Sequence, residues 1–187
     1  PNVRFMMGDV RDKDRMAQLM NHVDIVFHAA ALKHVSVCEY NPSEAIKTNV
    51  DGSLNIVEVA IAAGVKKVIG ISTDKAVHPI SSYGATKLTM ERLFIEACSY
   101  AQTKFACVRF GNFWASSNSV IELWERKKQT GQITVTDKNM SRFFIRFDEA
   151  VNFTLRCIDR MKGGEIFIPF MPSYTLEELA KQIAPDC

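Results

Sequence analysis

Five side chains with acid–base chemistry lie close together near the middle of the sequence. Thr73, Asp74 and Lys75 are consecutive, and Tyr83 is followed four residues later by Lys87. On a helix this spacing places Tyr83 and Lys87 on one face, where the two groups can act together. A tyrosine hydroxyl has an ordinary pKa of about 10, and a nearby ammonium group favours its phenolate form. The pattern therefore predicts that Tyr83 takes a proton from an alcohol, as hydride transfer at an alcohol carbon requires.

The residues before this group predict the strand that positions it. Residues 67–71 form a short apolar run rich in β-branched side chains, which is typical of a buried parallel strand. The polar residues 72–75 would then follow the carboxyl end of the strand, the edge of an open α/β sheet where ligands bind. Pro79 and two serines separate this strand from the next element, and a helix is predicted over residues 83–100.

The whole segment from Ser72 to Lys87 resembles a known enzyme superfamily. Y-x-x-x-K with Thr73 before it resembles the catalytic residues of the short-chain dehydrogenases/reductases, and STDKAV followed by YGATK is similar to the inverting UDP-N-acetylglucosamine 4,6-dehydratases. Related sugar dehydratases carry Asp-Glu in place of Asp74-Lys75, and the retaining, membrane-anchored relatives have Met in place of Tyr83. The resemblance implies catalytic roles for Thr73, Asp74, Lys75, Tyr83 and Lys87. The alternative interpretation of Asp74-Lys75 is a solvated loop pair.

The resemblance also implies the fold, an α/β, Rossmann-like, doubly wound parallel sheet that is incomplete in this chain. Further strands are predicted over residues 2–7, 24–31, 105–110 and 165–168, and helices over 12–20, 43–63, 119–129, 149–161 and 176–183, the last two capped by Asp148 and Thr175. The sequence contains no G-x-x-G-x-x-G turn, so we expect a fragment that lacks the N-terminal β-α units and the C-terminal end. Residues 1–112 are predicted to form a partial NAD(P)-binding domain, and residues 113–187 a partial substrate-binding region.

The resemblance assigns several residues to the cofactor. It places Asp9 and Val10 at the adenine ring, Ala29, Ala30 and Ala31 against the dinucleotide, and Asn49, Tyr83 and Lys87 near its reactive end. Alternative interpretations are a helix N-cap for Asp9, core packing for the alanines and a solvent-facing Asn49. The expected cofactor is NADP, with NAD possible.

A second group of residues is assigned to the substrate. The resemblance implies that Lys33, His34, Asn112, Thr134 and Arg142 contact a nucleotide sugar, with Arg142 suited to bind a diphosphate through paired hydrogen bonds. A loop lysine, a partly buried histidine and a surface arginine near a helix start are the alternatives. The stretch from Trp114 to Asn118 departs from the family, which has small residues and an Arg there, so the identity of the substrate is open.

The composition is that of an ordinary globular protein. The 187 residues are 47% hydrophobic and 24% charged with a net charge of +2, which predicts neither a nucleic-acid nor a membrane partner. The five cysteines form no C-x-x-C pair and indicate reduced thiols in a cytoplasmic protein. No metal site is predicted. The resemblance implies a homo-oligomer.

These observations predict an enzyme in its full-length form. The resemblance implies NADP-dependent 4,6-dehydration of UDP-N-acetylglucosamine, with inversion at C5, in the biosynthesis of bacterial surface polysaccharides or glycans. Tyr83 would act at C4, Lys75 would take the proton from C5, and Asp74 would protonate the departing C6 hydroxyl. The isolated chain is expected to be inactive. The alternatives are a nucleotide-sugar 4-epimerase, a retaining 4,6-dehydratase and a non-catalytic module that oligomerises or senses nucleotides.

Overall fold

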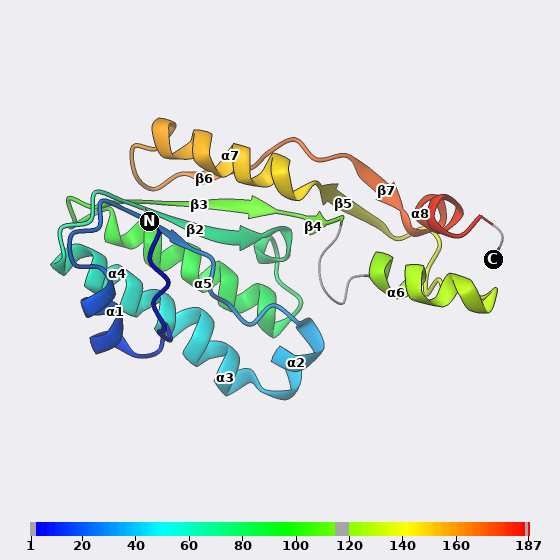
Figure 1. The fold of residues 1–187 in the computed structure, drawn as a ribbon, viewed down its shortest axis with the longest axis horizontal. Helices are drawn as coiled ribbons and strands as arrows, with labels where there is room; N and C mark the ends of the chain where they lie inside the picture. Colours follow the sequence, from blue (N-terminus) through cyan, green and yellow to red (C-terminus); the bar gives the residue numbers. More distant parts are fainter. Residues whose placement is uncertain (1–2, 115–119, 186) are drawn as a thin grey trace. The chain divides into compact units, whose positions relative to one another are not determined.

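A four-stranded sheet organises the first part of the chain (Figure 1). Its strands lie in the order β1 (Ile25–His28), β2 (Lys67–Thr73), β3 (Lys104–Phe110) and β6 (Ile166–Phe167). β1 pairs with β2 and β3 pairs with β6, both in parallel. Parallel strands joined by helices confirm the expected Rossmann-like α/β fold.

The structure, a computed structural model, describes residues 3–114, 120–185 and 187. Two compact units divide the chain. The first contains residues 1–109 and 154–168, and the second contains residues 110–153 and 169–187. It remains a prediction that residues 1–112 form a partial cofactor-binding domain and residues 113–187 a partial substrate-binding region.

Helices cover both faces of the sheet in the first unit. The helices of this unit are α1 (Lys13–Leu19), α2 (Val35–Tyr40), α3 (Pro42–Ile46), α4 (Gly52–Ala62), α5 (Ser82–Ala97) and the second half of α7 (Phe147–Arg160). α4 and α5 lie on one side of the sheet, and the second half of α7 lies on the other (Figure 1). Val68, Met90, Phe94 and Phe105 are fully buried between α5 and the strands. Burial of this apolar surface stabilises the unit and fixes α5 against β2.

The helix expected over residues 43–63 is interrupted. α3 ends at Ile46, a π-helical turn η1 follows over Lys47–Asp51, and α4 continues to Ala62. A π turn adds one residue to the helical repeat, and such turns are frequent at functional sites. Gly64 ends the segment with φ of 70°, as the glycine predicted.

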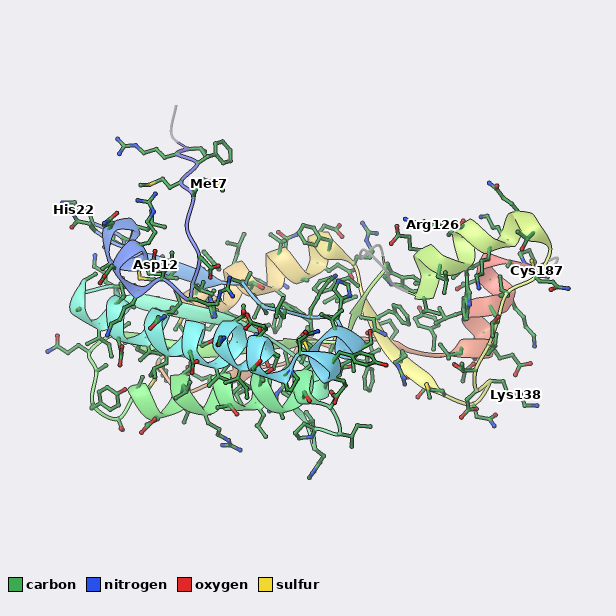
Figure 2. All side chains as sticks on the ribbon, turned by 90° about the horizontal axis from the view of Figure 1, so that it is seen from below. Met7, Asp12, His22, Arg126, Lys138 and Cys187 are labelled. Carbon is green, nitrogen blue, oxygen red and sulfur yellow. The ribbon has the colours of Figure 1, made fainter. Side chains whose placement is uncertain are left out.

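The second unit is built around a small mixed sheet that the sequence did not predict. β4 (Asn112–Phe113) pairs in parallel with β5 (Ser141–Ile145), and β5 pairs antiparallel with β7 (Ser173–Thr175). The helices are α6 (Val120–Lys127) with the 3₁₀ turn η3 (Lys128–Thr130), α8 (Leu176–Ile183) and the first half of α7. Trp124, Phe144, Leu176 and Leu179 form the buried core. Arg126 and Lys138 project outward from this unit (Figure 2).

The strand predicted over residues 2–7 was wrong. Residues 3–9 have no regular secondary structure, and Phe5 and Met7 are 97% and 89% exposed. A strand is stable only when its backbone groups are paired with a neighbour, and this segment makes no ladder with the sheet. Met7 lies in an extended stretch of chain (Figure 2), and its carbonyl accepts a hydrogen bond from Arg15 of α1 at 2.7 Å.

Helix caps were predicted with mixed success. Thr175 caps α8 in a capping box with Glu178, as expected. Asp12 caps α1 by accepting a hydrogen bond from the Arg15 amide, so the alternative of Asp9 as the cap was wrong. Asp148 is not a cap because α7 begins at Phe147; its carboxylate instead pairs with Arg146 at 2.7 Å. Among the described residues, no helix is long and apolar enough to cross a membrane.

Candidate active site

The turn after β2 is held by its own side chains. Thr73 is the last residue of β2 and is 6% exposed. Its hydroxyl accepts from the Lys75 amide at 3.3 Å and donates to Asp74 Oδ1 at 3.0 Å. These bonds start a 3₁₀ turn, η2 (Asp74–Ala76), at the carboxyl edge of the sheet, where the sequence predicted it.

Asp74 and Lys75 form a partly buried ion pair within this turn. Lys75 Nζ lies 3.0 Å from Asp74 Oδ1, and the two side chains are 35% and 25% exposed. The pair is therefore less solvated than an ordinary loop pair. An amine and a carboxylate in hydrogen-bond contact can exchange a proton, which is the chemistry that an acid–base pair needs.

The start of α5 is fixed against this turn. Ser81 caps the helix by accepting from the Gly84 amide at 3.2 Å. Glu39 of α2 accepts from both the amide and the hydroxyl of Ser82, at 2.6 and 3.0 Å. A Cβ on Gly84 would lie 2.2 Å from the carbonyl oxygen of Lys75, so only glycine lets α5 approach η2 this closely.

Tyr83 is consequently held beside the turn. Burial raises the pKa of its phenol to about 12; a hydrogen bond with the Thr73 side chain opposes the rise, and the charge of Asp74 adds to it. We expected Lys87 to favour the phenolate, but burial has the larger effect in the polypeptide by itself. Tyr83 is therefore a phenol at neutral pH unless a further positive charge reaches it.

Lys87 lies on the same face of α5, one turn further along. Its side chain is buried, and Nζ donates to Met90 Sδ at 3.0 Å. Burial lowers the pKa of Lys87 to about 8, while Cys107 and Glu91 oppose that change. His28, at the end of β1, has a pKa lowered to about 3 by burial and by the charge of Lys87, so it is neutral.

Asn49 faces the interior and joins two parts of this site. It is fully buried in η1; Oδ1 accepts from the Leu32 amide at 2.8 Å, and Nδ2 donates to the Leu32 carbonyl at 2.9 Å and to Thr86 Oγ1 at 3.0 Å. The loop after β1 is thereby tied to α5, which carries Tyr83. The alternative of a solvent-facing Asn49 was wrong, and its role toward a cofactor remains a prediction.

The other residues assigned to the cofactor also lie in the first unit. Ala29 and Ala30 are exposed and Ala31 is half-buried, which leaves an open surface after β1 that a ligand can approach. Asp9 pairs with Arg11 at 2.7 Å, and this hydrogen bond lowers the pKa of the Asp9 carboxyl to about 2. Val10 is half-buried, and its carbonyl accepts from Asn55 at 3.0 Å.

The residues assigned to the substrate are divided between the two units. Lys33 and His34 are exposed on the loop before α2 in the first unit. Asn112 lies in β4, and the Thr134 carbonyl accepts from Trp124 Nε1 at 3.0 Å, both in the second unit. Arg142 lies in β5, not near a helix start, and its guanidinium donates to the Ser141 carbonyl at 2.9 Å.

Trp114 belongs to the core of the second unit. Its ring centroid lies 4.8 Å from that of Phe144 and 5.4 Å from that of Tyr174. The rest of the stretch that departs from the family, residues 115–118, lies outside the described residues. In the described part of the chain, no cluster of three or more His, Cys, Asp or Glu side chains could hold a metal ion.

Sequence reasoning missed a charged cluster behind this site. Glu91 of α5 is fully buried and bonds to Ser72 of β2 and to Arg109 of β3. The signal was present, because Glu91 follows Tyr83 and Lys87 at intervals of four on the same helical face. Arg109 was equally visible as a charge among the otherwise apolar residues 105–110.

Comparison with known proteins identifies relatives over nearly the whole chain. An inverting UDP-N-acetylglucosamine 4,6-dehydratase of Campylobacter jejuni is 45% identical over 100% of this chain and 57% of its own length. An uncharacterized membrane protein of Methanocaldococcus jannaschii is 50% identical, covering 97% of this chain and 56% of that protein. A UDP-glucose 4-epimerase of Rickettsia akari is 42% identical, with 98% of this chain and 55% of the relative covered.

The fold has a counterpart among solved structures. Pen from Bacillus thuringiensis matches with a TM-score of 0.93 and 45% identity, covering 98% of this chain and 60% of that chain.

This chain spans little more than half the length of the curated relatives it matches. The family model described as polysaccharide biosynthesis protein matches residues 1–186. That match shows that the chain belongs to the polysaccharide biosynthesis protein family.

Proposed function

We propose that the whole protein carrying this chain is a nucleotide-sugar 4,6-dehydratase that acts on UDP-N-acetylglucosamine with inversion at C5. One observation carries the proposal: Asp74, Lys75 and Tyr83 meet around Thr73 at the carboxyl edge of the sheet. The similarity to a dehydratase at 45% identity supports the choice of reaction. Bacterial surface polysaccharides or glycans are the products to which such a sugar would contribute.

Tyr83 and Thr73 act first in the proposed mechanism. Tyr83 takes the proton from the C4 hydroxyl of the sugar, and the Thr73 hydroxyl holds the phenolic oxygen in place. A bound oxidised nicotinamide dinucleotide supplies hydride acceptance and return, and its positive charge favours the phenolate. Lys87 contributes a second positive charge from the same helical face.

Asp74 and Lys75 carry the elimination. A ketone at C4 makes the hydrogen on C5 acidic, and Lys75 removes it as a proton. Asp74 protonates the hydroxyl on C6, which leaves as water while the C5–C6 double bond forms. A proton passed from the Lys75 ammonium to Asp74 across their 3.0 Å contact would leave the two groups in the forms that this step needs. Return of the hydride to C6 of this alkene, together with protonation of C5 from the opposite face, would then give the inverted 4-keto-6-deoxy sugar.

The chain offers fitting groups for the cofactor. The exposed alanines after β1 permit close approach of a dinucleotide. The Lys87 ammonium has three N–H donors and donates to the Met90 thioether, a weak acceptor. Its other N–H groups can therefore donate to the ribose hydroxyls of the cofactor. Asp9 and Val10 would hold the adenine, and Asn49 would keep the loop before Lys33 in place. We propose NADP as the cofactor, with NAD as the alternative, and equilibrium dialysis of both against the whole protein distinguishes them.

The decisive experiment follows deuterium into the product. The whole protein is incubated with UDP-N-acetylglucosamine in deuterated water, and the product is examined by NMR. We expect a 4-keto-6-deoxy sugar with deuterium at C5 and inverted configuration.

Lys75→Ala should lower product formation by roughly a hundredfold or more, because it removes the proposed base. The control is Lys66→Ala, an exposed lysine paired with Asp24 at the other end of β2. Product formation by Lys75→Ala at the wild-type rate would contradict the proposed role.

A nucleotide-sugar 4-epimerase is the second candidate, since a UDP-glucose 4-epimerase is 42% identical to this chain. An epimerase uses Tyr83 and Lys87 but needs no acid–base pair for elimination. Epimerisation at C4 leaves the C5 hydrogen in place, so a 4-epimer without deuterium at C5 would favour this candidate. A cytoplasmic location and a homo-oligomeric state remain predictions, and sedimentation of the whole protein tests the second.

A further inference from the structure

A buried carboxylate joins three elements behind the proposed active site. Glu91 is fully buried, and both of its oxygens are engaged. Oε1 accepts from Ser72 Oγ at 2.5 Å and from Arg109 Nε at 2.8 Å, while Oε2 accepts from Arg109 Nη2 at 2.6 Å. α5, β2 and β3 therefore meet at one side chain. A buried charge with this many hydrogen bonds is costly to disturb, because its loss leaves the partner groups unpaired.

Glu91 links two elements that carry residues of the proposed mechanism. Ser72 directly precedes Thr73, so its bond to Glu91 holds the end of β2 where the catalytic turn begins. Glu91 itself follows Lys87 by one helical turn and Tyr83 by two. The carboxylate thus connects the strand that carries Thr73 and Asp74 to the helix face that carries Tyr83 and Lys87.

Glu91 is also the charged neighbour that favours a protonated Lys87. Cys107 from β3 and Glu91 from α5 itself raise the pKa of Lys87. Lys87 in turn lowers the pKa of His28 from β1. Burial keeps His28 neutral, with a pKa of about 3, and keeps the Cys107 thiol neutral, with a pKa of about 12. Glu91 is paired with the Arg109 guanidinium at 2.6 Å, so Arg109 offsets part of the charge of this carboxylate.

We propose that Glu91 is a positioning residue for the reaction: its carboxylate holds Thr73 and Asp74 in register with Tyr83. Its charge also opposes the loss of the Lys87 proton. The inference rests on the proposed function and adds to it a residue that does not touch substrate. Arg109 has a supporting role, because its guanidinium pairs with the buried Glu91 carboxylate and stabilises it there.

The test compares charge and geometry at this position in the whole protein. Glu91→Gln keeps the size and one acceptor but removes the charge, and Glu91→Asp keeps the charge but shortens the reach. For Glu91→Gln we expect kcat to fall roughly tenfold to a hundredfold with little change in KM, because positioning is lost before binding. We also expect the alkaline limb of the pH profile to move about one pH unit lower, because Lys87 loses its proton more readily. Glu91→Asp should lower kcat without moving that limb.

A matched control and a second readout keep the test decisive. Glu96→Gln changes an exposed carboxylate of the same helix and should alter neither kcat nor the limb. NMR titration of Lys87 with labelled lysine side chains reads the same shift without any turnover, so it separates failure of this inference from failure of the proposed function. A folded Glu91→Gln protein with an unmoved Lys87 titration would overturn the electrostatic part.

A separate variant tests whether the hydrogen bond between Ser72 and Glu91 positions the catalytic turn. Ser72→Ala removes one hydrogen bond to Glu91 while the charge and the Arg109 bonds stay. This variant remains usable if Glu91→Gln fails to fold, since the ion pair is retained. We expect a lower kcat with an unmoved alkaline limb, and a wild-type kcat would overturn the positioning role.

Discussion

Burial decides the protonation of individual residues around Tyr83. It raises the pKa of Tyr83 to about 12, lowers that of Lys87 to about 8 and lowers that of His28 to about 3. All three shifts favour the neutral form, because an apolar interior disfavours charge. Lys87 remains chargeable near neutral pH, whereas Tyr83 needs additional positive charge before it can act as a base.

This environment predicts a loss of stability at high pH. The pKa of Tyr83 is about 12 in the folded protein and about 10 in an unfolded chain, so the unfolded chain releases its proton first. We therefore expect the free energy of unfolding to fall as the pH rises from about 10 to about 12, by at most about 3 kcal/mol. Urea denaturation across this window should show a smaller decline for Tyr83→Phe. Tyr100→Phe, at a tyrosine that is 65% exposed, is the control. An unchanged slope in Tyr83→Phe would contradict the burial argument.

At the scale of elements, the site depends on how closely α5 approaches η2. Gly84 permits the contact, and Glu39 of α2 holds the first residue of the helix. Asn49 in the π turn η1 ties the loop after β1 to the same helix. The residues of the proposed active site are thus positioned by contacts between elements and not by their own side chains alone.

Gly84→Ala should separate these elements. The added Cβ would lie 2.2 Å from a backbone oxygen of Lys75, which cannot rotate away, so α5 must move. We expect a loss of stability of about 1–3 kcal/mol and a fall in kcat of roughly a hundredfold. Thermal unfolding and turnover of the whole protein measure the two effects. Thr89→Ala, at an exposed position of α5, should leave turnover unchanged. Full activity in Gly84→Ala would show that the close approach is unnecessary.

At the scale of the whole molecule, two units with separate cores share one chain. The chain leaves the first unit at Phe110, returns with the second half of α7 and leaves again at Pro169. Both tryptophans, Trp114 and Trp124, lie in the second unit, so tryptophan fluorescence reports on that unit. The core there is small and aromatic, and its stability depends on a few side chains.

Leu179→Ala should therefore lower the stability of the second unit measurably. Leu179 is fully buried against Trp124 and its neighbours, and removing a buried leucine side chain costs about 2–5 kcal/mol. Urea denaturation followed by tryptophan fluorescence should show a lower midpoint. Lys181→Ala, on the exposed side of α8, removes only a surface pair with Glu177 and should shift the midpoint little. Equal midpoints for wild type and Leu179→Ala would contradict the stabilising role of Leu179 in this core.

The sequence by itself determined the parts that depend on local patterns. The apolar run before Thr73 predicted β2, the i, i+4 spacing predicted that Tyr83 and Lys87 share a face, and Thr175 predicted the start of α8. These features follow from period and capping chemistry, which a few neighbouring residues specify. The resemblance carried by the same residues implied the fold and the family, which the structure and the relatives bear out.

Only the tertiary structure decided what depends on distant partners. Residues 3–9 have strand-like composition but form no strand, because pairing requires a neighbouring backbone. The small sheet of the second unit joins β4, β5 and β7 from separated parts of the chain. The pKa of Tyr83 and the bonds from Glu91 to Ser72 and Arg109 arise from burial between elements. Local sequence specifies which groups are present, and packing between elements sets their charge and their contacts.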